Sequence, residues 1–120
     1  MQVDVERLPQ SRVRLTVTIP VDDVTRAMDV AFKKLVRRYE IPGFRRGKAP
    51  RSVFERFVGR QTILQEAAEQ LVESRYPEAV EQAALDPVER PRISLEKVAD
   101  GEPLIFVAEI AVKPMVDLGD

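Results

Sequence analysis

The chain has 120 residues, of which 44% are apolar and 32% are charged, and its formal net charge is −1. This composition can supply a core, which excludes a largely disordered chain, and the near-neutral charge excludes a uniformly basic nucleic-acid binder. Because the sequence has no His and no Cys, it also excludes disulfides, zinc-thiolate sites and Ser-His-Asp or Cys-His catalysis.

Residues 2–19 alternate between apolar and polar side chains, which predicts a β-hairpin with one buried and one solvated face. The alternation is clearest in the second arm, where every second residue is apolar: Val13, Leu15, Val17 and Ile19. Pro, Gln and Ser at residues 9–11 suit the turn between the two arms.

The pattern then changes to apolar residues at spacings of three and four, which predicts an amphipathic helix over residues 22–40. Two prolines and two glycines predict a loop over residues 41–50. A short helix is expected over residues 51–58, followed by a longer one over residues 62–85. Pro77 lies inside the longer helix and is expected to kink it or to split it in two.

After a connector, residues 92–98 and 104–112 read as two strands joined by a turn over residues 99–102. The second strand is apolar at nearly every residue of its start, so it is expected to be central in its sheet or covered on both faces. The order ββ-ααα-ββ predicts an α+β fold, with a four-stranded, mostly antiparallel sheet and helices packed on one face. Apolar residues in the tail after Pro114 have no predicted element to pack on: Met115, Val116 and Leu118.

The charge of this chain is sharply polarised. Residues 33–60 hold ten bases and two acids, a net charge of +8, whereas the other residues hold nine bases and eighteen acids. A solvated face explains many basic runs, but a basic loop of this charge attracts an anionic partner. Phe44 lies within this loop, where it either folds back on its own domain or docks into a partner, and the residues alone slightly favour folding back.

Two other sites are weighed against ordinary explanations. Gly43, Gly47 and Lys48 do not form a phosphate-binding P-loop, because the spacing is wrong and Ala49 follows the lysine. The glutamates on one side of the long helix are explained by solvation rather than by metal binding, because no His completes a ligand set: Glu66, Glu69 and Glu73. No catalytic residue and no metal site is predicted.

Residues 43–50 read Gly-Phe-Arg-Arg-Gly-Lys-Ala-Pro. This segment resembles the signature Gly-Phe-Arg-x-Gly-Lys-x-Pro of the trigger factors, a family of bacterial ribosome-associated chaperones. The Met-Gln-Val start, the basic hairpin strand and the ββ-ααα-ββ order extend the resemblance over essentially the whole chain.

The resemblance implies a docking domain that anchors a chaperone at the ribosomal exit tunnel, where emerging polypeptides are shielded and helped to fold. The implied partners are a large-subunit ribosomal protein beside the tunnel with adjacent ribosomal RNA, and nascent polypeptide chains. The implied contact residues are those of the loop: Gly43, Phe44, Arg45, Arg46, Gly47, Lys48 and Pro50. A supporting basic surface is expected from Lys33, Lys34, Arg37, Arg38 and Arg51.

Residues 1–120 are therefore expected to form one ribosome-binding domain, a piece of a longer chaperone. The family's prolyl isomerase and C-terminal domains are absent from this sequence, so we expect no isomerase activity. No membrane is predicted as a partner, because no targeting segment and no run of about 20 apolar residues is visible. No cofactor and no small-molecule ligand is predicted either. The expected location is cytoplasmic and ribosome-associated.

One alternative stays open from the residues. Residues 33–60 suit a general RNA-binding module that tracks phosphates without a protein partner. The two hypotheses differ in how they depend on Phe44. Phosphate binding should survive its removal, whereas protein docking should depend on Phe44 and Arg45 individually.

Overall fold

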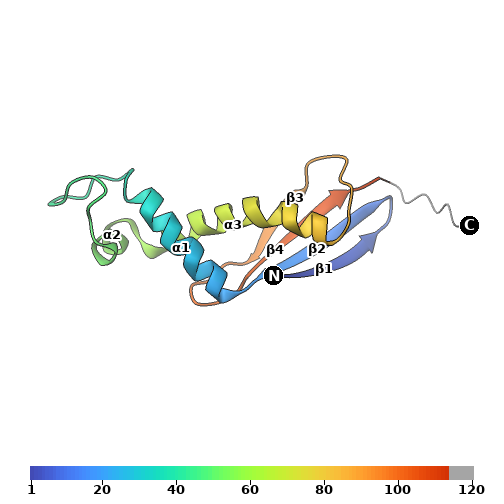
Figure 1. The fold of residues 1–120 in the computed structure, drawn as a ribbon, viewed down its shortest axis with the longest axis horizontal. Coiled ribbons are helices and arrows are strands. Elements are labelled where there is room, and N and C mark those ends of the chain that lie inside the picture. Colours follow the sequence, from blue (N-terminus) through green and yellow to red (C-terminus); the bar gives the residue numbers. More distant parts are fainter. Residues whose placement is uncertain (114–120) are drawn as a thin grey trace, which may run out of the picture.

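The computed structural model describes residues 1–113. Within this range the chain forms four strands and three helices in the order ββ-ααα-ββ (Figure 1). Their bounds are β1 Gln2–Leu8, β2 Arg12–Ile19, α1 Val21–Leu35, α2 Arg51–Val58, α3 Arg60–Gln82, β3 Arg92–Lys97 and β4 Leu104–Ala111. The predictions for the tail after Pro114, including Met115, Val116 and Leu118, lie outside the described residues.

The strands form one sheet in the order β1-β2-β4-β3, and each neighbouring pair is antiparallel. This arrangement confirms both predicted hairpins and the α+β class. Strand β4 is central, as expected, and it is covered on one face: alternate residues are fully buried and the others are half-exposed. The buried face pairs Leu15 with Ala108 and Val17 with Phe106 across β2 and β4.

Helix α3 covers this apolar face of the sheet, and α1 packs on α3. Helices α1 and α3 pack against each other, and α3 also contacts β4 (Figure 1). The amphipathic stripe of α1 is buried as predicted, through Val24, Met28 and Ala31, and it meets buried residues of α3 such as Ala67. The core therefore lies between a helix pair and the inner face of β2 and β4.

Helix α1 ends at Leu35, five residues before the predicted end at residue 40. A continued helix would pair the Val36 carbonyl with the backbone N–H of residue 40. That carbonyl instead accepts a hydrogen bond from the backbone N–H of Gly47. The loop therefore begins earlier than the apolar periodicity indicates.

Helix α3 runs through Pro77 as one helix, so the predicted alternative of two helices is wrong. Pro77 is exposed, which lets water satisfy the carbonyl that loses its partner. Buried Leu71 and Ala79 flank the proline on either side, so packing stabilises the helix both before and after it. The helix ends at Gln82 rather than residue 85, and Ala84 adopts a positive φ of 55° just beyond it.

The molecule is elongated, with a Cα radius of gyration of 18.2 Å, against about 14 Å for a compact chain of this length. Helix α2 and the loop between α1 and α2 lie at one end, beyond the sheet (Figure 1). No helix among the described residues is long and apolar enough to cross a membrane.

Candidate functional site

The candidate site is the loop of residues 36–50, and its base is anchored in the core. Val36, Ile41 and Ala49 are buried, with exposed fractions of 4–5%. The backbone N–H of Gly47 donates to the carbonyl of Val36 at 3.2 Å and ties the two ends of the loop together. The base is therefore part of the folded domain and not a free tether.

Two tight turns shape the tip of the loop. The N–H of Phe44 donates to the Ile41 carbonyl at 3.1 Å, and the N–H of Lys48 donates to the Arg45 carbonyl at 2.9 Å. Gly43 and Gly47 adopt φ values of 88° and 82°. L-amino acids with side chains rarely take such angles, so both turns require glycine.

An aromatic cluster of Phe32, Tyr39 and Phe54 supports the loop. Phe54 of α2 is fully buried, and its ring packs edge-to-face on Tyr39, with ring centroids 5.6 Å apart. The same ring packs edge-to-face on Phe32 of α1, also at 5.6 Å. Phe54 thus connects an aromatic ring before the loop with one inside it, and each such pair typically contributes about 0.5–1.5 kcal/mol beyond area burial.

The tip presents one aromatic and several basic side chains to solvent. Phe44 is 41% exposed, so the slightly favoured prediction that it folds back on its own domain is wrong. Short turns on both sides hold it away from the core. Arg45, Arg46 and Lys48 are exposed beside it.

The predicted supporting bases divide into two groups. Three of them form ion pairs within the fold: Lys33 with Asp29 at 3.1 Å, Lys34 with Glu66 at 2.7 Å, and Arg51 with Glu55 at 3.0 Å. Among residues 1–113, the other bases of residues 33–56 have no acidic partner within ion-pair distance: Arg37, Arg38, Arg45, Arg46, Lys48 and Arg56. The charge available to a partner is therefore concentrated on the loop and α2.

Ion pairs also lower the pKa values of two carboxyl groups, those of Glu66 and Asp100. The hydrogen bond from Lys34 lowers the pKa of Glu66, and the nearby Arg38 contributes in the same direction. The hydrogen bonds from Arg60 lower the pKa of Asp100, which lies in the turn between β3 and β4. These pairs join α1 to α3, and α3 to the sheet.

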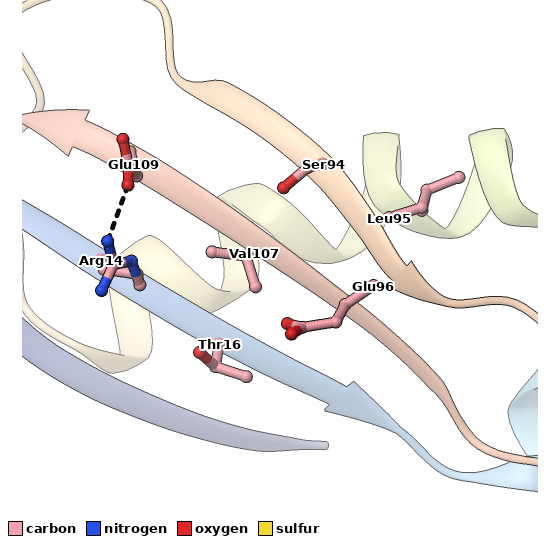
Figure 2. Close-up of a pocket in the computed structure, with 7 residues that line it drawn as sticks. All are labelled: Arg14, Thr16, Ser94, Leu95, Glu96, Val107 and Glu109. Carbon is pink, nitrogen blue, oxygen red and sulfur yellow. Dashed lines mark hydrogen bonds and ion pairs between the residues drawn. The ribbon is translucent and has the colours of Figure 1, made fainter.

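A hollow of about 650 Å³ lies on the outer face of the sheet, away from the loop (Figure 2). Two of its lining charges are paired, because Arg14 donates to Glu109 at 3.0 Å, and Arg14 also donates to Glu6 at 3.2 Å. These hydrogen bonds raise the pKa of Arg14. None of the predicted site residues lines the hollow.

The glutamates considered for a metal site, Glu66, Glu69 and Glu73, do not form a ligand cluster in the part of the chain that the structure describes. Glu66 is engaged by Lys34, and the described residues contain no cluster of three or more potential metal ligands from His, Cys, Asp and Glu. Two features of the loop's surroundings are not predicted from the sequence. These are the aromatic contacts of Phe54 and the exposed pair Arg56 and Phe57 on α2. The apolar spacing of so short a helix does not distinguish the buried Phe54 from the exposed Phe57.

Comparison with known proteins gives the relationship directly. Residues 1–120 match the family model described as bacterial trigger factor protein. The chain belongs to the trigger factor family. It is 44% identical to the trigger factor of Moorella thermoacetica over 119 residues, which are 99% of this chain and 27% of that protein. It is 47% identical to the trigger factor of Bacillus subtilis over 106 residues, or 88% and 25% of the two chains.

Solved structures of trigger factors share this fold. A trigger factor chaperone studied for promiscuous substrate recognition in folding and assembly superposes with a TM-score of 0.76, at 24% identity, over 96% of this chain and 27% of its own. A structure from work on the domains of trigger factor from Thermotoga maritima gives a TM-score of 0.57 at 28% identity, over 82% and 90% of the two chains. The chain spans about a quarter of the length of the curated trigger factors it matches.

Proposed function

We infer that this chain is the ribosome-docking domain of a trigger-factor chaperone. It anchors the chaperone at the nascent-chain exit tunnel through residues 43–50, so that emerging polypeptides are shielded and helped to fold. One observation carries the proposal: Phe44 is held exposed beside Arg45 and Arg46, on a loop whose base is buried and braced. Exposing an aromatic ring this way is unfavourable in isolation, so a partner surface that buries it is expected.

The tip offers three kinds of contact. Phe44 supplies apolar burial, and Arg45 suits a charge-assisted pair with an acid on a ribosomal protein. Arg46 and Lys48 suit the phosphates of neighbouring ribosomal RNA, so part of the affinity should weaken with salt. Because the turns and the buried base already order the loop, binding costs less conformational entropy than it would for a flexible segment.

The alternative is a general RNA-binding module built on residues 33–60. The Lys and Arg side chains without an acidic partner favour this alternative, but Lys33, Lys34 and Arg51 are held in ion pairs within the fold. Those three are less available to phosphates than the sequence suggests. Phosphate tracking also gives no role to the exposed Phe44 ring, whereas docking does.

Binding of single variants to bacterial 70S ribosomes separates the two functions. A fluorescent label at the N-terminus reports binding by anisotropy. Docking predicts that Phe44→Ala and Arg45→Ala each weaken binding by about tenfold or more, as residues at the centre of an interface do. Phosphate tracking predicts that Phe44→Ala binds like wild type, while each lost base weakens binding to a similar, small extent. Val30→Ala, at another exposed apolar residue on α1, is the control for Phe44.

The remaining expectations follow from this function. We propose no catalytic role for residues 1–120, because docking requires binding alone. The whole chaperone is proposed to be cytoplasmic and to bind nascent polypeptide chains. No cofactor, metal or small-molecule ligand is required by docking.

A further inference from the structure

Phe57 on α2 belongs neither to the buried core nor to the loop of residues 43–50. Its side chain is 61% exposed, the largest exposed fraction among the large apolar side chains of residues 1–113. It lies seven residues beyond the end of the loop, on the helix whose other ring, Phe54, is fully buried. Burial of so exposed a ring by a partner contributes favourably to binding.

Helix α2 has two different sides. At 100° per residue, Arg51, Phe54 and Glu55 lie on one side, where they contact α1, the loop and the start of α3. Ser52, Arg56 and Phe57 lie on the other side, and all three are exposed. Arg56 has no acidic partner among residues 1–113. The outer side of α2 therefore presents an unpaired guanidinium and an exposed aromatic ring from consecutive residues.

The charge around this surface is predominantly positive, with Glu40 as the one exposed acid of the loop among residues 36–58. Six bases without an acidic partner lie on the loop and α2, at the same end of the molecule (Figure 1). Glu55, the acid of α2, is already engaged by Arg51 and Arg60. An anionic partner is therefore favoured here. An apolar protein pocket is not favoured, because Val53, one turn before Phe57, is partly buried and α2 presents no wider apolar patch.

We propose that Arg56 and Phe57 form a second contact surface, outside residues 43–50, which binds unpaired nucleotides of the large-subunit ribosomal RNA. Phe57 stacks on a base and Arg56 contacts a phosphate, which is the usual chemistry of single-stranded RNA recognition. The identity of the RNA rests on the proposed function. The two surfaces then divide the contacts, with Phe44 on protein and Phe57 on RNA.

The test measures binding to 70S ribosomes by anisotropy with four variants of α2. Stacking predicts that Phe57→Ala and Phe57→Leu bind about tenfold more weakly than wild type, whereas Phe57→Trp binds like wild type. Arg56→Gln should reduce the slope of log affinity against log salt concentration by somewhat less than one, because one phosphate contact is lost. Val30→Ala and Arg90→Gln are matched controls, since both residues are exposed and lie outside this surface.

Chemical probing of the ribosomal RNA with dimethyl sulfate identifies the partner. At saturating concentration, wild type and Phe57→Trp should protect the same unpaired bases, and Phe57→Ala should leave at least one of them reactive. Two results would overturn the proposal: wild-type affinity for Phe57→Ala, or wild-type affinity for Phe57→Leu combined with weak binding of Phe57→Ala. The second result would place the ring in an apolar protein pocket.

Failure of this proposal is distinguishable from failure of the docking function. Loss of binding in Phe44→Ala with wild-type behaviour of every α2 variant removes the second surface and leaves loop docking intact. Wild-type binding of Phe44→Ala and Arg45→Ala removes loop docking, whatever the α2 variants do. All the substituted side chains are exposed, so circular dichroism should show the same folded domain throughout.

Discussion

The backbone N–H of Gly47 donates to the carbonyl of Val36 at 3.2 Å, across the base of the basic loop. This one bond ends α1 and closes the loop, because the carbonyl it occupies would otherwise accept from the next turn of the helix. The loop that follows is therefore an ordered part of the domain. Its shape, and not only its charge, is available to a partner.

Gly47→Ala tests this closure. The φ of 82° is strained for alanine, by about 1–2 kcal/mol, which is comparable with the net contribution of the bond to Val36. We expect the strain to be relieved by opening of the loop, with ribosome binding weakened several-fold. Gly101→Ala is the matched control, because Gly101 has a φ of 76° but lies in the hairpin between β3 and β4. Equal ribosome binding by the two variants would contradict the closure.

Phe54→Leu tests the aromatic brace. The substitution removes both edge-to-face contacts of the buried ring, so the free energy of unfolding should fall by about 1–3 kcal/mol. Backbone amides of residues 36–50 should exchange hydrogen faster, as measured by mass spectrometry. Phe106→Leu removes an equally buried ring from β4 and should leave the loop protected relative to the rest of the domain. A loop that exchanges alike in both variants is incompatible with a brace at Phe54.

The stability of the domain should fall at acidic pH through Glu66 and Asp100. Their pKa values are lowered in the folded state by Lys34 and Arg60 respectively, so the unfolded chain takes up protons first as the pH falls. The stabilisation is complete above the ordinary carboxyl pKa values of 4.5 and 3.8 and is lost as the pH falls through the lower, folded-state values. Urea unfolding at pH 6.5 and pH 3.5 should show a smaller loss for Glu66→Gln/Asp100→Asn than for wild type. An identical loss would show that other groups dominate.

Tyr76→Phe should preserve or increase stability. The Tyr76 hydroxyl is buried without a hydrogen-bond partner among residues 1–113, and this burial raises the pKa of the phenol. Removing an unsatisfied hydroxyl avoids its desolvation cost, so the free energy of unfolding should rise by up to about 1 kcal/mol. Thermal unfolding followed by circular dichroism measures the change. A clear decrease in melting temperature would mean that the hydroxyl has a partner after all.

The sequence predicts this fold well where local chemistry decides it. Pro50 and Gly59 bound α2 at the predicted residues 51–58, because both residues act on their own backbone. The predicted end of α1 is wrong because the Val36–Gly47 bond joins residues distant in sequence. The split at Pro77 is wrong because packing on both sides of the proline outweighs one lost hydrogen bond.

The candidate site shows the same division. Its location follows from the charge and from the motif of residues 43–50. The sequence does not show which Lys and Arg side chains are free of an acidic partner. Lys34 and Arg51, for example, are paired with acids on other elements or on the next turn of the same helix. The exposure of Phe44 and Phe57 depends likewise on turns and packing that the residue pattern alone leaves open.

Co-sedimentation with bacterial 70S ribosomes tests the central claim most directly. The wild-type chain is compared with Phe44→Ala/Arg45→Ala/Arg46→Ala at low and at moderate salt. Loop docking predicts that wild type pellets with ribosomes at both salt concentrations, while the triple variant stays in the supernatant. If both proteins pellet at low salt and both are released at moderate salt, binding is nonspecific attraction to phosphates. That result would contradict docking through the loop.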